Sequence, residues 1–303
     1  MKDKTMRTAI ITGANVGLGY ETALDLTGQG YAVVLACRNP EKAAAAKERM
    51  LKRNPWATVE AMEIDTSSLA SVEAFAAAYQ RRYTTLDLLI NNAGVMMSPY
   101  QVTEDGFESQ LATNYLGHFA LTGRLLPMLL QTPGSRVVSL SSLAHRWSPI
   151  QLHDLHFQKG YSKRKAYGQS KLACLMFAYE LDRRLKEHEH RTLSVAAHPG
   201  LSDTNLAQHM PPMLKWLSPM IGQSAVAGAQ PTLYAALSPN INGGEYIGPN
   251  GFQEWRGKPI GVPSKDTSHD ERMASALWEK SEEMTGVTYG FTQLQQQKSR
   301  KRQ

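Results

Sequence analysis

Cysteine is scarce in this chain: Cys37 and Cys174 are the only two among 303 residues. Two cysteines cannot build a disulfide framework, and no cysteine and histidine spacing here resembles a zinc site. Apolar runs of about 18 residues, the length that crosses a bilayer as a helix, are also lacking. The N-terminal MKDKTMRTAIITGA leads into a strand-like segment instead of a signal peptide. We therefore expect a soluble, cytoplasmic protein without stable membrane insertion.

The net charge of +6 gives little indication of a nucleic-acid partner. Four of the positive charges lie in the last six residues, KSRKRQ, which no aromatic or folded basic motif accompanies. We interpret 291–303 as a basic, disordered, solubilising tail and expect no nucleic acid to bind.

Short apolar segments alternate with amphipathic ones along the chain. Strands are expected at 7–12, 31–37, 58–64, 86–91, 136–141, 192–198 and 245–248, and helices at 40–53, 68–82, 108–130 and 165–187. Uninterrupted apolar strands separated by helices indicate a mainly parallel sheet with helices on both faces. No linker divides the chain, so we predict an α/β fold: one doubly wound domain of about seven strands over 1–290. A C-terminal extension from about residue 250 carries its own helix at 268–285.

The stretch TGANVGLG at 12–19 joins the first strand to the first helix. A turn with few side chains lets backbone N–H groups approach a pyrophosphate, and the helix N-terminus adds partial positive charge. NNAG at 91–94 ends the fourth strand, where an open parallel sheet presents its ligand crevice. Each motif alone is a common turn, but together they predict a dinucleotide site.

The stretch KAYGQSKLA at 165–173 places Tyr167 and Lys171 four positions apart. On a helix this spacing puts both side chains on one face. An ammonium at roughly 6 Å and an effective dielectric of about 20 favours phenolate by on the order of 2 to 3 kcal/mol. The phenol then becomes a usable proton donor near neutral pH. For an isolated Y-x-x-x-K, a solvated surface pair is the commoner explanation.

The four motifs TGANVGLG, NNAG, SLSS at 139–142 and YGQSK at 167–171 occur in this order. With them the chain resembles the short-chain dehydrogenase/reductase family over nearly its whole length. SSLAHRW, HDLHFQKGYSKRKAY, SDTNLA and LWEKSEEMTG are most similar to the retinol dehydrogenase branch and its soluble bacterial relatives. The resemblance implies a Rossmann-type domain that transfers hydride between a nicotinamide and a carbonyl or alcohol carbon.

The resemblance also implies four catalytic residues. Tyr167 matches the proton donor and acceptor, and Lys171 the residue that favours its phenolate and binds the nicotinamide ribose. Ser142 matches the group that hydrogen-bonds the substrate oxygen, and Asn114 the one that organises a proton-relay water. Neighbouring serines alternate on a strand, so only one of Ser141 and Ser142 can face the crevice. The family places its second serine there, and we therefore choose Ser142.

The cofactor is expected to contact six segments. They are Gly13, Asn15, Gly17, Leu18 and Gly19; Arg38; Asp65 and Thr66; Asn91, Ala93 and Gly94; and Pro199, Gly200, Leu201 and Thr204; Tyr167 and Lys171 complete the set. Thr204 and the Leu201 backbone would contact the carboxamide. NAD-type folds carry an acidic residue about 20 positions beyond the glycine loop. Here Cys37 stands there and Arg38 follows, so we expect NADP (NADPH), with a merely solvated Arg38 as the alternative.

Two segments are expected to shape the substrate site. Tyr167 follows Ser142 by 25 positions, and His153, His156 and Lys159 of this insertion are expected to wall the substrate mouth. A metal site at HDLH, 153–156, is the rival interpretation, but no further ligands accompany it and no metal is expected. The methionine-rich 210–222 suggests an apolar lid, with a core helix or a membrane-surface contact as alternatives.

The expected substrate is a small apolar aldehyde, ketone or alcohol. A nucleotide-sensing regulator is one alternative, although a sensor needs no proton donor. A C=C reductase similar to protochlorophyllide reductase is another, although its cysteine-bearing substrate region is not evident. Membrane-bound retinol dehydrogenases begin with an apolar anchor that this sequence lacks, and assembly into a homo-oligomer stays open.

Overall fold

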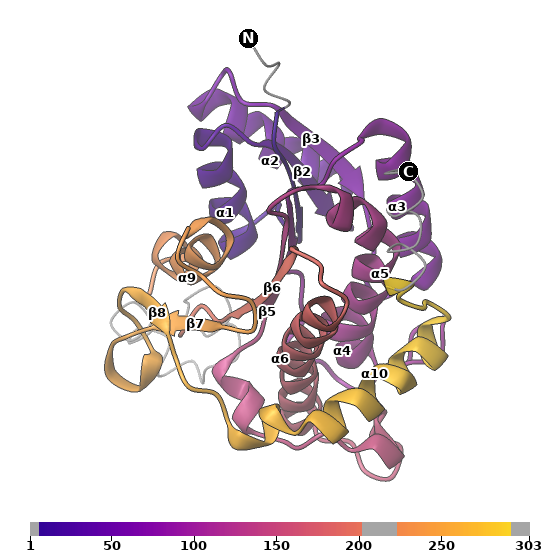
Figure 1. Cartoon of the computed structure of the whole chain (residues 1–303). Coiled ribbons are helices and arrows are strands. Elements are labelled where there is room, and N and C mark those ends of the chain that lie inside the picture. Colours follow the sequence, from indigo (N-terminus) through magenta and orange to yellow (C-terminus); the bar gives the residue numbers. More distant parts are fainter. Residues whose placement is uncertain (1–5, 202–222, 292–303) are drawn as a thin grey trace.

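The computed structural model describes residues 6–201 and 223–291. In that part of the chain eight strands form one sheet in the order β3-β2-β1-β4-β5-β6-β7-β8, seen nearly edge-on in Figure 1. The strands are β1 Thr8–Thr12, β2 Ala32–Cys37, β3 Val59–Glu63, β4 Leu88–Asn91, β5 Arg136–Leu140, β6 Leu193–Ala197, β7 Tyr246–Pro249 and β8 Pro259–Gly261. The first seven are parallel, and β8 pairs antiparallel with β7. The predicted α/β sheet is thus confirmed, except that the sequence analysis missed β8, a three-residue, mostly exposed edge strand.

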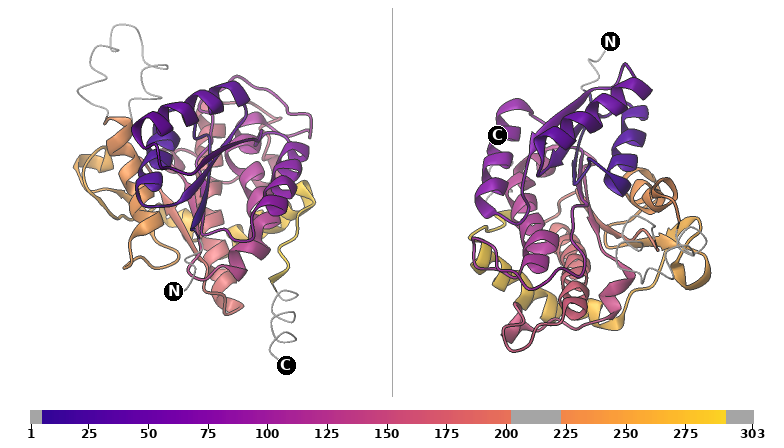
Figure 2. Two further views of the ribbon diagram at one scale, coloured as in Figure 1. Left: turned by 90° about the horizontal axis from the view of Figure 1, so that it is seen from above. Right: turned by 180° about the vertical axis from the view of Figure 1, so that it is seen from behind.

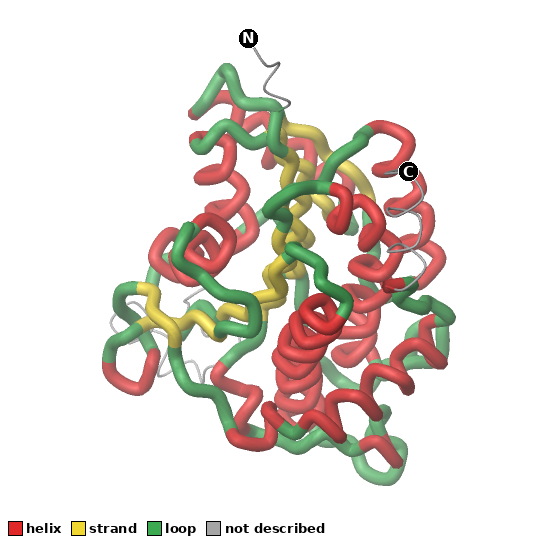
Figure 3. The backbone as a smooth tube through the Cα atoms, viewed as in Figure 1, coloured by secondary structure: helices red, strands yellow, loops and turns green. Residues whose placement is uncertain are grey.

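Helices cover both faces of the sheet (Figures 1, 2 and 3). One face carries α1 Gly17–Gly28, α2 Pro40–Arg53 and α9 Ala225–Leu237; the other carries α3 Leu69–Arg82, α5 Gly117–Gln131 and α6 Lys163–Glu187. α10 Glu271–Thr285 packs on the outside of α6. Shorter helical turns are α4 Ser109–Leu111, η1 Ala112–Leu116, η2 Leu143–Arg146, η3 Leu152–Asp154, η5 Phe252–Glu254 and η6 Asp266–His269. The predicted helix at 108–130 is therefore α4, a π-helical turn η1, and α5 in succession.

The central strands are apolar on both sides because each side faces a helix layer. Every residue of β1 and β2 is buried. Ile10 and Val34 belong to the core beneath α3, α5 and α6, whereas Ile11 and Val33 belong to the core beneath α1, α2 and α9. This two-sided burial produces the continuous apolar runs of a parallel sheet.

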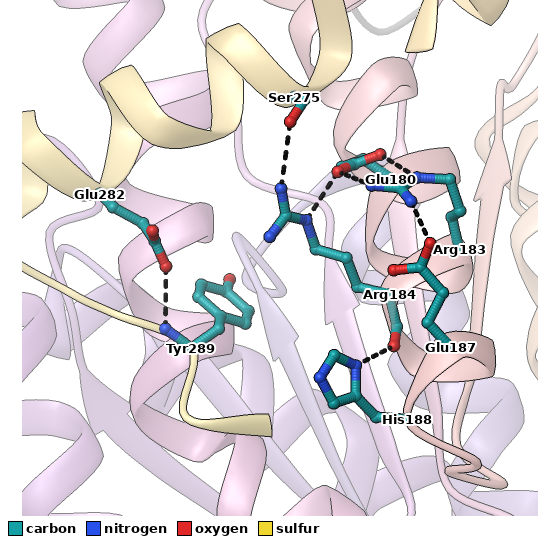
Figure 4. A network of polar contacts seen from close by, with 8 residues as sticks. All are labelled: Glu180, Arg183, Arg184, Glu187, His188, Ser275, Glu282 and Tyr289. Atoms are coloured by element: carbon teal, nitrogen blue, oxygen red, sulfur yellow. Dashed lines mark hydrogen bonds and ion pairs between the residues drawn. The ribbon is translucent and has the colours of Figure 1, made fainter. Parts of the chain in front are cut away.

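The C-terminal helix α10 is anchored to α6 by aromatic and cation–π contacts. Trp278 is 1% exposed and stacks on Phe177, with the ring centroids 5.8 Å apart. In Figure 4 the carboxylate of Glu180, on α6, accepts hydrogen bonds from Arg183 and Arg184. The Arg184 guanidinium also lies 4.6 Å from the Trp278 ring centroid, so α10 is held against the outer side of α6.

Replacing Asp270 with alanine is expected to destabilise the fold by about 1 kcal/mol, the usual cost of losing an N-cap. Asp270 caps α10, and its Oδ1 accepts a hydrogen bond of 3.0 Å from the Met273 N–H. Urea unfolding followed by tryptophan fluorescence measures the change. Glu279→Ala, at an exposed position of the same helix, is the control and should change the free energy of unfolding less; equal effects would show that the cap does not matter.

Candidate active site

Two adjoining cavities lie where β1, β2, β4, β5 and β6 end. The tyrosine cavity has a volume of about 190 Å³ and the glycine-turn cavity about 390 Å³. Leu18, Asn92, Gly94 and Val95 line both, so the two form one continuous cleft. The carboxyl ends of parallel strands are the usual place for ligands in open α/β sheets.

The turn before α1 forms one wall of the glycine-turn cavity, through Gly13, Asn15, Gly17, Leu18 and Gly19. Gly13 has a φ of +67°, a left-handed conformation that L side chains rarely adopt. A Cβ at Gly19 would lie 2.5 Å from the Gly13 carbonyl oxygen. Glycine is therefore required here for backbone geometry and for the close approach of turn and helix.

Arg38 is the one cationic side chain among the described residues that line the glycine-turn cavity. Asp65, Thr66, Ala93 and Gly94 line it too. The Asp65 carboxylate is held in place by hydrogen bonds from the Ser67 N–H at 2.8 Å and hydroxyl at 2.6 Å. Cys37 does not line the cavity: it is 2% exposed, and burial raises the pKa of its thiol to about 11.

Tyr167 and Lys171 lie on α6 and both line the tyrosine cavity. The helix begins after Ser162, whose hydroxyl caps it by accepting from the Lys165 N–H. The Lys171 Nζ lies 6.0 Å from the centroid of the Tyr167 ring and donates a 3.1 Å hydrogen bond to the Leu140 carbonyl. The lysine is thus fixed at the end of β5 with its charge beside the phenol.

The two serines at the end of β5 differ in whether the hydroxyl already donates a hydrogen bond within the protein. Ser141 is 3% exposed, and its hydroxyl donates a 2.8 Å hydrogen bond to the Lys171 carbonyl. Ser142 caps η2, where its Oγ accepts from the Ala144 N–H at 3.2 Å. Both line the tyrosine cavity, but only the Ser142 hydroxyl can still donate a hydrogen bond to a ligand. The geometry therefore favours Ser142 as the serine that meets a substrate.

Asn114 lies behind the cavities, inside the π-helical turn η1. Its side-chain amide donates to the Val95 carbonyl and the Ser170 hydroxyl, each at 2.9 Å, and accepts from the Val95 N–H at 2.7 Å. The amide therefore binds Val95 as a neighbouring strand would. π-Helical turns are rare and frequent at functional sites, and this one aims Asn114 at the chain that follows NNAG.

A buried hydrogen-bond chain, which the sequence analysis missed, supports the NNAG turn. The Thr12 Oγ1 accepts from the Asn92 and Ala93 N–H groups at 2.9 Å and lies 2.9 Å from the His118 Nε2. The His118 Nδ1 lies 2.9 Å from the Asn114 carbonyl, which can only accept, so Nδ1 carries the proton. Burial lowers the pKa of His118 to about 4 and keeps it neutral. The signal was present in TNYLGHF, where Asn114 and His118 are four positions apart on a helix.

Some predicted residues lie elsewhere. The Asn91 side chain is buried and donates to the Thr122 hydroxyl at 3.0 Å; its neighbour Asn92 lines both cavities instead. Pro199, Gly200 and Leu201 line the tyrosine cavity. Thr204 and the expected lid at 210–222 lie outside the described residues.

His153, His156 and Lys159 do not line the tyrosine cavity as predicted; of the segment between Ser142 and Tyr167, Leu143, Ala144 and Trp147 line it. The reason is that the insertion packs against α4: the His156 Nδ1 accepts from the Glu108 N–H, and its ring stacks on Phe107. The Asp154 carboxylate accepts from the N–H groups of Gln158 and Lys159. Within the described ranges no group of three or more His, Cys, Asp or Glu side chains could hold a metal ion.

Comparison with known proteins agrees with the geometry. Residues 7–215 match the short chain dehydrogenase family. The chain is 38% identical to human Retinol dehydrogenase 14, over 93% of this chain and 87% of that protein. It is 40% identical to Short-chain dehydrogenase TIC 32 B, chloroplastic, of Brassica napus, over 79% of each chain. A crystal structure of an uncharacterized protein from Mycobacterium paratuberculosis superposes with a TM-score of 0.79 at 42% identity, covering 93% of this chain and 94% of that one.

Among residues 6–201 and 223–291, no helix is both long enough and apolar enough to span a membrane. The ordered motifs, the strand-end cleft and relatives that match most of the chain agree on one assignment. The protein belongs to the short-chain dehydrogenase/reductase family.

Proposed function

We propose that this protein is an NADP(H)-dependent oxidoreductase that interconverts apolar aldehydes or ketones and the corresponding alcohols. The observation that carries the proposal is that Tyr167, Lys171 and Ser142 line one cavity, which continues into the cavity of the glycine turn. A proton donor and an oxygen-binding hydroxyl thus stand at one end of a cleft suited to a dinucleotide.

The residues of the cleft fit a nicotinamide dinucleotide. The glycine turn leaves no room for side chains at Gly19, so backbone groups can meet a pyrophosphate at the start of α1. Arg38 supplies a cation near the end of β2, and Asp65 and Thr66 line the same cavity. A bound nicotinamide would supply or accept the hydride.

The chain's own residues hold the reacting oxygen and move its proton. Ser142 donates a hydrogen bond to the substrate oxygen, and Tyr167 gives that oxygen its proton in the reducing direction. Lys171, tied to the Leu140 carbonyl, places its ammonium group beside the Tyr167 ring and binds the ribose. Asn114 holds Val95 in the cavity wall; its role towards a relay water stays a prediction.

The lining of the tyrosine cavity favours an apolar substrate. Val95, Met96, Leu143 and Trp147 line it beside the polar Ser142 and Tyr167. Such a wall binds hydrocarbon and leaves one place for an oxygen. The names of several relatives, the retinol dehydrogenases, are in line with an apolar alcohol.

The test is a panel of apolar and polar aldehydes, ketones and alcohols, followed by NADPH absorbance with the purified protein. We expect turnover with apolar carbonyls and lower KM values as the hydrocarbon part grows. NADPH binding without turnover of any carbonyl or alcohol would contradict the proposal and favour a nucleotide sensor, and turnover confined to C=C bonds would favour the other alternative.

A further inference from the structure

The loop between β7 and β8 carries a carboxylate that contacts two residues adjoining the lining of the tyrosine cavity. The Glu254 Oε1 accepts a 2.8 Å hydrogen bond from Arg146 Nη2, and its Oε2 lies 3.0 Å from His198 Nε2. Arg146 ends η2, the turn that begins after Ser142. His198 follows β6 and precedes the 199–201 turn, which lines the cavity. One side chain thus links segments from two different strands.

The backbone of this loop is held in an unfavourable conformation. Gln253 and Glu254 have φ values of +50° and +59°, in the left-handed region that non-glycine residues rarely adopt. Such conformations persist where surrounding contacts impose them, and they cluster at functional sites. Here the contacts include a 2.9 Å hydrogen bond from the Leu201 N–H to the Trp255 carbonyl. The loop therefore meets the 199–201 turn through its backbone as well as through Glu254.

His198 transmits the contact to the turn. It is fully buried, and the Gly200 N–H donates to its Nδ1 at 3.2 Å. The neutral imidazole therefore carries its proton on Nε2, facing Glu254 without the in-line geometry of a hydrogen bond. Burial lowers the pKa of His198. Burial alone would raise the pKa of Glu254, but His198 and Arg146 outweigh it and hold that pKa below its ordinary value.

We propose that Glu254 is a positioning residue for the tyrosine cavity, acting on the 199–201 turn through His198 and on the segment after Ser142 through Arg146. Glu254 lines neither the tyrosine cavity nor the glycine-turn cavity, so it acts through these neighbours. The inference rests on the proposed function, because the turn is where the nicotinamide carboxamide is expected to bind. Loss of the carboxylate should loosen the nicotinamide end of the cleft and leave the adenosine end unchanged.

Glu254→Gln, which keeps the shape and removes the charge, tests this. NADPH affinity is measured by fluorescence titration, affinity for 2′,5′-ADP by displacement of NADPH, and kcat with the best carbonyl of the panel. We expect NADPH affinity to fall about fivefold and kcat about tenfold, a modest share of what a misplaced reacting group costs. Affinity for 2′,5′-ADP, which occupies the adenosine end alone, should stay within about twofold of the wild-type value.

Glu283→Gln removes a carboxylate that is 69% exposed on α10 and is the matched control, expected to change none of these values. Unchanged NADPH affinity and kcat in Glu254→Gln, or equal losses for NADPH and 2′,5′-ADP, would overturn the proposal. If Glu254→Gln does not fold, Arg146→Gln should lower kcat with NADPH affinity retained, and an unchanged kcat would overturn it. A wild-type protein that binds no NADPH would overturn the proposed function itself.

Discussion

Replacing Tyr167 with phenylalanine is expected to lower kcat at least about a hundredfold, the usual scale of general acid catalysis. The substitution removes the phenolic proton and leaves a ring of nearly the same shape. The Lys171 Nζ, 6.0 Å from the ring centroid, keeps its hydrogen bond to the Leu140 carbonyl. NADPH should therefore still bind, which fluorescence titration checks while NADPH absorbance gives kcat.

Tyr100→Phe is the matched control for this experiment. Tyr100 is 43% exposed and packs edge-on against Tyr161, and it does not line the tyrosine cavity. Its loss of a hydroxyl should leave kcat within about twofold of wild type, as is usual for a surface change. Near-normal turnover of Tyr167→Phe would reject Tyr167 as the proton donor, and an equal loss in both variants would point to a general effect of removing a tyrosine hydroxyl.

Much of the fold could be predicted because burial on two sides leaves a clear pattern. β1 and β2 are continuous apolar runs, and α2 was predicted with its bounds because Asn39 caps its start and Pro40 is its first residue. β8 was not predicted because a three-residue edge strand shows neither an apolar run nor an alternation of apolar and polar residues in the sequence. The π-helical turn η1 was not predicted because its extra residue per turn leaves the amphipathic pattern of 108–130 almost unchanged.

The site could be predicted where a motif lies on consecutive residues of one element. Tyr167 and Lys171 share a helix face, and the glycine turn is one segment. Thr12 and Glu254 were missed because their contacts join segments far apart in the sequence. The contact of His118 with Asn114 spans only four positions and could have been found in TNYLGHF. Asn91 and Asn92 show the same limit on a smaller scale: NNAG gives the turn, but only the path of the backbone decides which asparagine reaches the cleft.

The proposed preference for NADP(H) rests on Arg38. A guanidinium can bind a phosphate bidentately, whereas the acidic residue of NAD-type folds binds the ribose 2′-OH and repels a 2′-phosphate. Arg38 lines the glycine-turn cavity, and Cys37, at the position of that acid, is neutral and buried. The missing carboxylate and the present cation favour the same cofactor, NADP(H).

Arg38→Ala is therefore expected to raise the KM for NADPH by about 10- to 150-fold, since a hydrogen bond to a charged group contributes about 1.5 to 3 kcal/mol. The KM for NADH should change little, because NADH has no 2′-phosphate. Initial rates with both cofactors and one carbonyl substrate measure this. Arg53→Ala, an exposed cation at the end of α2, is the matched control for lost positive charge and should leave both KM values near those of wild type.

A second substitution, Cys37→Asp, should turn the weakened preference into a reversed one. The thiol already faces the N–H groups of Ala14 and Asn15, so a carboxylate in its place would find donors despite burial. Its negative charge at the end of β2 would repel a 2′-phosphate and leave a 2′-OH acceptable. Cys37→Asp with Arg38→Ala should accordingly give a higher kcat/KM with NADH than with NADPH. A wild-type protein with a lower KM and a higher kcat for NADH than for NADPH would show instead that Arg38 is merely solvated and that the proposed cofactor is wrong.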